Sequence, residues 1–302
     1  MRVTHVITRL IVGGAQENTI ASVLGLRAKP GLTVDLISGP TTGPEGTLEP
    51  RVAGVPGLLT IEPRLIRAVS PWHDALALRA LTHRFRAQRP DLVHTHSGKA
   101  GVLGRLAAHA AGVPLIVHTI HGPSFGAFQG PLANALFRVA EQRAGRVTTH
   151  FVSVAHAMTE QYLAAGIGTP AQYTRIFSGF DLEPFLNAKN DLALRAKLGL
   201  SPEDFVVGKV ARLFEHKGHM HLLGAALVVA AQFPQTKVLL VGDGSWRAGL
   251  ERFVRNGPGS DLLRDRVVFA GLVRPEDVPS YIGIMDAVVH LSRREGLARV
   301  LP

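Results

Sequence analysis

Short, continuously apolar segments alternate with longer segments of helical periodicity along almost the whole chain. Most of the apolar segments lack the polar–apolar alternation that marks a strand with one solvent-facing side. Continuous apolar strands are typical of a parallel sheet that helices cover on both faces. We therefore predict an α/β fold with strands at 3–8, 33–38, 92–95, 115–119, 149–154, 205–211, 237–241, 267–270 and 287–292. Helices are expected at 15–27, 73–88, 99–111, 131–144, 155–165, 217–232, 246–255 and 275–284.

Residues 178–204 interrupt this rhythm, because the stretch is polar, contains two prolines and precedes a new series that starts with a strand. We place a domain boundary near residue 187. This gives two doubly wound, Rossmann-like domains, 1–186 and 187–302, facing a cleft, with ligands at the carboxyl ends of the strands. The second domain shows about four strands where about six are common, so we expect it to be incomplete, as in a truncated chain.

Composition narrows the range of partners. The net charge of +10, from 33 Lys and Arg against 23 Asp and Glu, favours anionic ligands. Cysteine is absent, which excludes disulfides, thiolate metal ligands and cysteine nucleophiles. Nucleic acid is not an expected partner, because the charge is spread over both halves, aromatic residues make up 6% and no binding motif occurs. A cytoplasmic protein is expected, because no signal peptide or membrane-length apolar run is visible.

The stretch "ARLFEHKGH" places Arg212 and Lys217 at a predicted strand-to-helix junction, on a loop that leaves a buried strand and opens a helix. Such a loop presents unpaired backbone N–H groups and the positive end of the helix dipole. With two added cations it could hold a diphosphate, each charge-assisted hydrogen bond contributing about 1.5–3 kcal/mol. The alternative is a pair of solvated surface cations.

Glycines mark two further turns after predicted strands. Gly13 and Gly14 separate the first strand from the first helix, and Gly242 and Gly244 follow the strand at 237–241 in "VGDGSWR". Glycine allows a tight turn and a close approach of backbone to a ligand. The stretch at Gly13 and Gly14 lacks the GxGxxG spacing of a dinucleotide site, and an ordinary strand-to-helix turn would look the same. The turn at Gly242 and Gly244 is by itself a weak signal.

His121 lies just past the end of the strand at 115–119, before a loop that contains Gly, Pro and Phe. A histidine at a strand tip can hydrogen-bond a substrate hydroxyl, although a capping or core histidine is the common alternative. His94 and His96 have a spacing compatible with metal ligands, but no carboxylate is suitably placed beside them, so no metal site is expected. Glu295 and Gly296 follow the last predicted strand and offer a carboxylate and backbone N–H groups to a polyhydroxyl ligand.

Taken in order, "GGAQ", "HG" after a strand, "FSGFD", "ARLFEHKGH", "LVGDG", "FAGLV" and "LSRREGLARVLP" resemble family-4 glycosyltransferases of the GT-B fold. The resemblance spans essentially the whole chain and is greatest to bacterial members that build cell-surface glycans. It implies a retaining, metal-independent glycosyltransferase without a cofactor. The donor would be a nucleotide-diphosphate sugar, held by 187–302, and the acceptor a lipid-linked glycan or an oligosaccharide, held by 1–186.

The resemblance also implies roles for individual residues in the second domain. Arg212 and Lys217 match the pair that clamps the donor diphosphate. Glu295 matches the first Glu of a Glu-x7-Glu motif that contacts the transferred sugar, and the following Gly296 and Leu297 would add backbone contacts. The second Glu of this motif would fall one position beyond Pro302.

Other matches concern loops in both domains. Gly13 and Gly14 correspond to a loop near phosphate and acceptor, and His121 to a histidine near the donor sugar. Leu272 and Val273 lie where the family passes backbone around the nucleotide base. Ser178 stands at the domain joint where the family usually has Asn, and no return helix is visible after the last strand.

Several alternatives stay open at this point. A GT-B nucleotide-sugar epimerase or an inactive fragment of a transferase would share these patterns. Residues 71–90 form a basic amphipathic pattern with Leu78, Leu81 and Phe85 on one face. This helix could rest on anionic lipid at the inner face of the membrane, or it could be an ordinary packed surface helix.

Overall fold

The computed structural model describes residues 1–43, 45–96, 98–126, 128–179, 181–293, 295–298 and 300–301. The chain divides into two compact units, Met1–Gly179 and Phe180–Pro302, which we describe separately. The division falls a few residues before the boundary expected near residue 187.

The first unit contains a fully parallel sheet of seven strands in the order β3-β2-β1-β4-β5-β6-β7. The strands are β1 (Arg2–Ile7), β2 (Thr33–Ser38), β3 (Leu59–Ile61), β4 (Leu92–His96), β5 (Leu115–Ile120), β6 (His150–Ser153) and β7 (Tyr173–Arg175). The five strands predicted for this part of the chain are confirmed. The edge strands β3 and β7 were missed because each has only three residues, none of them fully buried.

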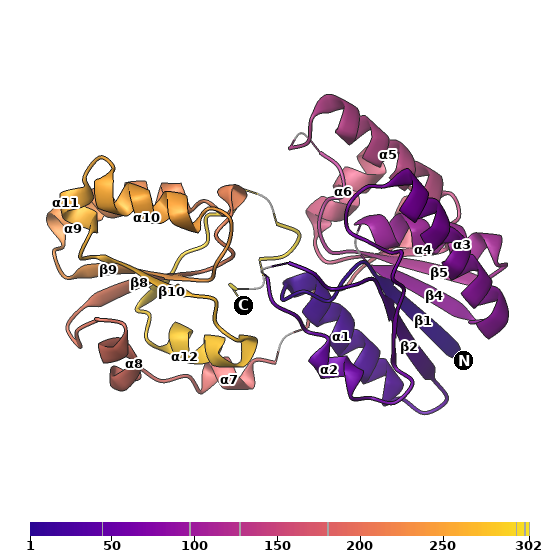
Figure 1. Cartoon of the computed structure of the whole chain (residues 1–302), viewed down its shortest axis with the longest axis horizontal. Coiled ribbons are helices and arrows are strands. Elements are labelled where there is room, and N and C mark those ends of the chain that lie inside the picture. Colours follow the sequence, from indigo (N-terminus) through magenta and orange to yellow (C-terminus); the bar gives the residue numbers. More distant parts are fainter. Residues whose placement is uncertain are drawn as a thin grey trace. The chain divides into compact units, whose positions relative to one another are not determined.

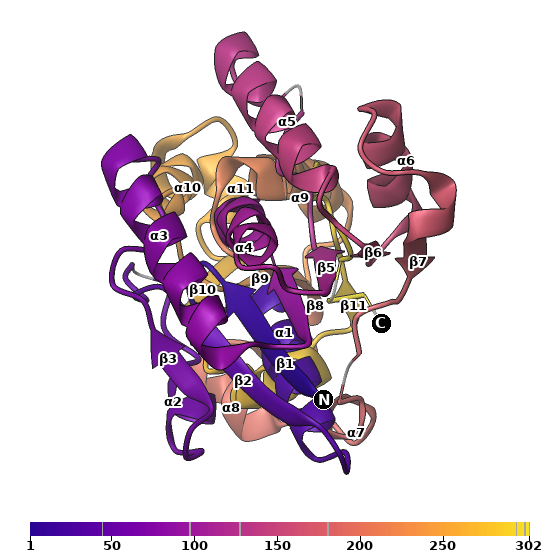
Figure 2. The same ribbon diagram turned by 90° about the vertical axis from the view of Figure 1, so that its right-hand side faces the viewer.

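Helices cover both faces of this sheet (Figure 1). The helices are α1 (Gly14–Arg27), α2 (Pro50–Ala53), α3 (Pro71–Gln88), α4 (Gly98–Ala110), α5 (Pro131–Gly145) and α6 (His156–Ala164), with a 3-10 turn η1 (Pro170–Gln172). Figure 2 shows α1 on one face of the sheet and α3 and α4 on the other. Because side chains alternate along a strand, Val6 packs with α3 and α4 while Ile7 packs on the α1 side.

The basic helix expected to be available to lipid is α3, and its apolar face lies in the core. Leu81 and Phe85 are each 1% exposed and Leu78 packs beside them against α4 and the sheet. Since burial in the core already uses this face, it is not available to a lipid surface. Of the two alternatives for residues 71–90, the structure shows the packed helix.

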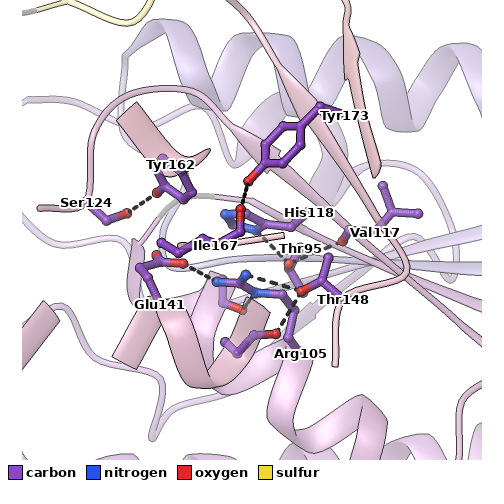
Figure 3. Close-up of polar contacts among 12 residues, drawn as sticks. Thr95, Arg105, Val117, His118, Ser124, Glu141, Thr148, Tyr162, Ile167 and Tyr173 are labelled. Atoms are coloured by element: carbon purple, nitrogen blue, oxygen red, sulfur yellow. Dashed lines mark hydrogen bonds and ion pairs between the residues drawn. The ribbon is translucent and has the colours of Figure 1, made fainter. Parts of the chain in front are cut away.

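A buried ion pair ties α4 to α5 in the first unit (Figure 3). Arg105 is fully buried, donates to the carboxylate of Glu141 and also bonds the carbonyl of Gly101 at 2.7 Å. A third contact, to Thr148 Oγ1 at 3.4 Å, links α4 to the chain just before β6. Removing one partner would leave a buried charge unpaired, which is strongly destabilising.

The second unit contains a parallel sheet of four strands in the order β10-β9-β8-β11 (Figure 1). The strands are β8 (Phe205–Val210), β9 (Thr236–Val241), β10 (Val267–Gly271) and β11 (Ala287–Val288). The helices are α7 (Glu183–Leu186), α8 (Leu192–Lys197), α9 (His219–Gln232), α10 (Arg247–Asn256), α11 (Ser260–Leu263) and α12 (Val278–Gly283), with 3-10 turns η2 (Glu215–Lys217) and η3 (Pro275–Asp277). One core lies between the sheet and α9, α10 and α11, and a second between the sheet and α8 and α12. The doubly wound fold predicted for both parts of the chain is confirmed.

Two predicted elements need correction. The helix predicted from 217 begins at His219, because Gly218 adopts the left-handed conformation with φ 74° and follows the 3-10 turn that ends at Lys217. A Cβ on Gly218 would lie 2.1 Å from the carbonyl oxygen of Leu291, so the close approach of these loops requires glycine. The strand predicted at 287–292 pairs with β8 only as far as Val288.

Both sheets have a topological switch point, where neighbouring strands send their connections in opposite directions. It lies between β1 and β4 in the first unit and between β8 and β11 in the second. In open parallel sheets, ligands bind beyond the carboxyl ends of the strands at such points. Among the described residues, no helix is both long and apolar enough to cross a membrane.

Candidate functional site

An ion pair joins the two loops that border the switch point of the second unit. Lys217, from the turn before α9, donates to the carboxylate of Glu295, which follows β11 by several residues. His290 Nε2 lies 3.4 Å from the same carboxylate oxygen. The side chains of Lys217 and Glu295 retain 13% and 25% exposure, so the pair is shielded yet accessible from solvent.

The ion pair shifts the acidity of Glu295. Burial raises the pKa of this carboxyl, but the hydrogen bond and positive charge of Lys217, with the nearby His290, lower the pKa overall. Glu295 is therefore an anion at neutral pH. An anionic carboxylate accepts hydrogen bonds and suits a ligand rich in hydroxyl groups.

A second lysine lies buried beside this pair. Lys209, in β8, is fully buried, and its Nζ has no hydrogen-bond partner among the described residues. Burial, together with the charge of Lys217, lowers its pKa to about 8, although the charge of Glu295 opposes this shift. The site therefore contains more positive than negative charge, which favours an anionic ligand.

Arg212 lies on the loop that directly follows β8. Its guanidinium carbon stands 4.9 Å from the centre of the Phe214 ring, a cation–π contact that orients the side chain. The carbonyl of Arg212 lies 3.0 Å from Nε2 of His219 in the first turn of α9. Burial lowers the pKa of His219 to about 4, so the ring is neutral and donates this hydrogen bond. The loop is thus fixed at both its side chain and its backbone.

Gly242 and Gly244 bring the loop after β9 against the loop after β8. Both have positive φ, 134° and 159°, and Gly242 bonds the carbonyl of Gly271 through its N–H at 2.8 Å. A Cβ on Gly242 would lie 2.2 Å from the Ala211 carbonyl oxygen, and one on Gly244 2.6 Å from that of Leu213. These glycines are required by backbone packing within the site, whatever they contact in a complex.

The other expected residues of this unit follow strands β10 and β11 in the sequence, after the carboxyl ends of these strands. Leu272 and Val273 directly follow β10; Leu272 is 53% exposed, whereas Val273 packs into the core beside α12. Gly296 and Leu297 are partly buried next to Glu295. The expected contacts of these four residues with a nucleotide or sugar stay predictions.

The expected residues of the first unit lie at the ends of β1 and β5. Gly13 precedes α1, which begins at Gly14, and its carbonyl accepts the first helical hydrogen bond, from Glu17, at 3.0 Å. His121 directly follows β5, and its Nε2 lies 3.0 Å from Nδ1 of His96 at the end of β4. The roles implied for Gly13, Gly14 and His121 stay predictions.

Some residues of these sites escaped the sequence analysis. Lys209 and His219 looked like parts of a strand and a helix, and only the fold shows that both lie beside Lys217. His5 was missed as well. The register of β1 and β4 sets His5 opposite His94, and ligand atoms of His5, His94 and His96 all lie within 4.8 Å of one another. No metal site was expected at His94 and His96, and this stays a prediction, although β1 adds a third imidazole to the group.

Family models match most of the chain. A model described as glycosyl transferase 4-like domain matches residues 13–177, and one described as glycosyl transferases group 1 matches residues 190–301. The chain belongs to this family of glycosyltransferases.

Curated relatives include glycosyltransferases of known reaction. The chain is 31% identical over 239 residues to the UDP-Gal:alpha-D-GlcNAc-diphosphoundecaprenol alpha-1,3-galactosyltransferase of Escherichia coli, a match that covers 78% of this chain and 60% of the relative. It is 24% identical to the alpha-monoglucosyldiacylglycerol synthase of Acholeplasma laidlawii, with 82% and 63% covered. The chain thus spans less than two thirds of these relatives.

Solved structures confirm the GT-B fold class. The Anabaena protein HepE, crystallised with UDP and glucose, superposes with a TM-score of 0.75 at 22% identity, covering 97% of this chain and 74% of HepE. The apo form of the lipopolysaccharide outer core galactosyltransferase WaaB superposes with a TM-score of 0.67 at 14% identity, covering 100% and 77%. At these identities, the likeness is one of fold.

The first prediction concerns backbone packing at the site. Gly242→Ala should destabilise the second unit by about 1–3 kcal/mol, because the new methyl group meets a carbonyl oxygen and φ is unfavourable. Gly224→Ala, in the middle of α9 with nothing within 4 Å of the added Cβ, should instead stabilise by about 0.5–1 kcal/mol. Urea unfolding followed by Trp246 fluorescence, in a background where the exposed Trp72 is replaced by Phe, reports on this unit. Equal effects of the two changes would show that the backbone at Gly242 does not require glycine.

The second prediction concerns pH. Since the pKa of Glu295 lies below its ordinary value of 4.5, its contribution to stability should be complete above that pH and disappear as pH falls through the lower, folded-state pKa. In the same fluorescence assay, wild type should therefore exceed Glu295→Gln in stability at neutral pH, and the difference should shrink in acid. Glu203→Gln, which makes the same change at an exposed position of this unit, is the matched control. A difference that does not change with pH would show that the carboxylate charge is irrelevant.

Proposed function

We propose that the protein transfers a sugar from a nucleotide-diphosphate sugar to an acceptor hydroxyl, with retention of configuration, in the synthesis of a cell-surface glycan. One observation carries this proposal. Lys217 and Glu295 come from the two loops that flank the switch point of the second unit, and they meet there with an accessible cation and an accessible carboxylate. A diphosphate and a sugar are the two ligand groups that such a pair suits.

Lys217 can serve the carboxylate and a phosphate together. An ammonium group has three N–H donors, so a bond to Glu295 leaves donors for a phosphate oxygen. In the free protein, Glu295 holds the lysine in position, which limits the entropy lost when the ligand binds. Arg212 and the first turn of α9 add donors to the same anion, and buried Lys209 adds positive potential.

The proposed chemistry uses these cations where charge develops. The bond between the anomeric carbon of the sugar and the diphosphate oxygen breaks, and a new bond forms from the acceptor oxygen to the same face of that carbon. The departing diphosphate gains negative charge, which Arg212 and Lys217 stabilise. The acceptor hydroxyl gives its proton to the leaving diphosphate, so no protein nucleophile is needed. We propose that the side-chain cations do the work of a metal ion.

The acceptor is proposed to be lipid-linked and bound by the first unit. Support comes from the names of two relatives, one acting on a diphosphoundecaprenol-linked sugar and one named as a synthase of a glucosyl lipid. The proposed setting is accordingly the inner face of the membrane, with the protein itself on the cytoplasmic side.

The proposal is tested by the loss of one cation. Lys217→Ala should lower kcat/KM for transfer by roughly 10²–10³-fold, because one donor to the developing charge is removed. Lys197→Ala, which removes an exposed lysine on α8 of the same unit, is the control and should retain activity. Products are measured with UDP-, GDP- and ADP-sugars and lipid-linked acceptors, after Trp246 fluorescence has shown that each variant is folded.

Near-wild-type transfer by Lys217→Ala would remove the assigned role of the lysine. A wild-type chain that converts the nucleotide sugar without any acceptor would favour an epimerase.

Contact with an anionic membrane is proposed through α5, since α3 uses its apolar face in the core. Leu132, Leu136 and Val139 recur at helical spacing on α5 and are 85%, 57% and 46% exposed, and Arg138 and Arg143 are exposed nearby. Leu132→Asp should reduce co-sedimentation with phosphatidylglycerol vesicles roughly tenfold. Leu192→Asp, at an exposed leucine of α8, is the control. Sedimentation that is equal for both variants, or equal with neutral vesicles, would contradict this contact.

A further inference from the structure

Three histidines of the first unit form a continuous hydrogen-bonded chain at its switch point. Nδ1 of His5 lies 2.9 Å from Nε2 of His96, and Nδ1 of His96 lies 3.0 Å from Nε2 of His121. His5 is fully buried in β1, His96 is 1% exposed at the end of β4, and His121 follows β5. This histidine chain thus runs from the centre of the sheet to its carboxyl edge.

A fourth histidine packs on this chain without joining it. The ring centre of His94 lies 4.3 Å from that of His96 and 4.8 Å from that of His5, and its Nε2 bonds Thr119 Oγ1 at 2.7 Å. His118 takes no part, because it points to the opposite face of the sheet, where it bonds Thr95 (Figure 3).

The buried rings of the chain are neutral. Burial lowers the pKa of His5 well below its ordinary value, and His94 lowers it further. Burial likewise lowers the pKa of His96, with contributions from the surrounding histidines. A neutral imidazole has one N–H donor and one bare nitrogen acceptor, so His96 must donate one of its two hydrogen bonds and accept the other.

The hydrogen bonds along the three histidines can therefore all point outward or all point inward. The protonation of His5, at the buried end, distinguishes these two polarities. If the bonds point outward, His5 donates to His96, His96 donates to His121, and Nε2 of His5 is a bare acceptor. If they point inward, Nε2 of His5 carries a proton. This atom is buried and has no hydrogen-bond partner among the described residues. Orphaned buried N–H groups are rarer in proteins than under-used acceptors, so the outward polarity is favoured.

The same distances count against a metal ion at this cluster. A separation of 2.9 Å between two ring nitrogens is a hydrogen bond with one proton between them. The ring planes of His94 and His96 are tilted by only 31° at a centre distance of 4.3 Å, so these rings stack and do not converge on a common ion.

We propose that His5 and His96 are positioning residues that fix His121 in the tautomer with its proton on Nδ1. In this tautomer, His121 can donate a hydrogen bond only through Nδ1, since Nε2 accepts from His96. This inference rests on the proposed function in one respect: the ring atom so fixed, Nδ1 of His121, is the one that would donate to a substrate hydroxyl. The tautomer itself does not depend on any transfer activity.

The test is the tautomer of His121 in the full chain labelled with ¹⁵N-histidine. Long-range ¹H–¹⁵N correlation distinguishes protonated from bare ring nitrogens, and His121→Gln identifies the signals by their loss. Wild type should show a protonated Nδ1 and a bare Nε2 at neutral pH. A protonated Nε2 would overturn the proposal, as would a zinc ion that wild type retains at one per chain and His94→Gln loses.

Two matched variants separate positioning from packing. His96→Leu fills the buried space but removes the N–H that Nε2 of His121 accepts. The opposite tautomer of His121 should then gain population and turnover should fall roughly tenfold, the equivalent of one hydrogen bond. His96→Asn carries an amide N–H near the place of Nδ1 and should restore both. An unchanged His121 tautomer in His96→Leu would overturn the proposal. A correct tautomer without sugar transfer would instead contradict the proposed function and leave the histidine chain standing.

Discussion

The ion pair between Lys217 and Glu295 is the interaction on which the account of the second unit depends. It forms only because β8 and β11 are neighbours in the sheet, although the two residues lie 78 positions apart in the chain. The close approach of the loops requires Gly218, whose missing side chain leaves room for the Leu291 carbonyl. Sheet order, one glycine and two charges together produce a shielded cation beside a carboxylate.

In the first unit, side chains also meet at the switch point of the sheet, but they are of a different chemical kind. Its switch point also brings together residues from strands that are distant in sequence, but the result is a chain of neutral imidazoles. The parallel register of β1 and β4 aligns His5 with His94. Because side chains alternate between the two faces along a strand, His96 of β4 points to the same face as His94. In both units, the geometry of a parallel sheet determines which side chains can act together.

The sequence was sufficient for most of the strands and for the loops that carry Arg212 and Lys217, because continuous apolar runs indicate parallel strands. It was insufficient where the backbone conformation of a single residue sets the boundary of an element. The helix of α9 begins two residues later than its periodicity suggests, since a left-handed glycine separates Lys217 from it. The charged neighbours of Lys209 and the hydrogen-bond partner of His5 could not be found from sequence, because strand order and register bring them together.

The measurement that tests the central claim most directly is a crystal structure with a bound nucleoside diphosphate, UDP or GDP. The account predicts that pyrophosphate oxygens lie within hydrogen-bond distance of Lys217 Nζ and the Arg212 guanidinium, while Lys217 keeps its bond to Glu295. A nucleotide bound elsewhere, with these two cations still facing solvent or protein, would contradict it.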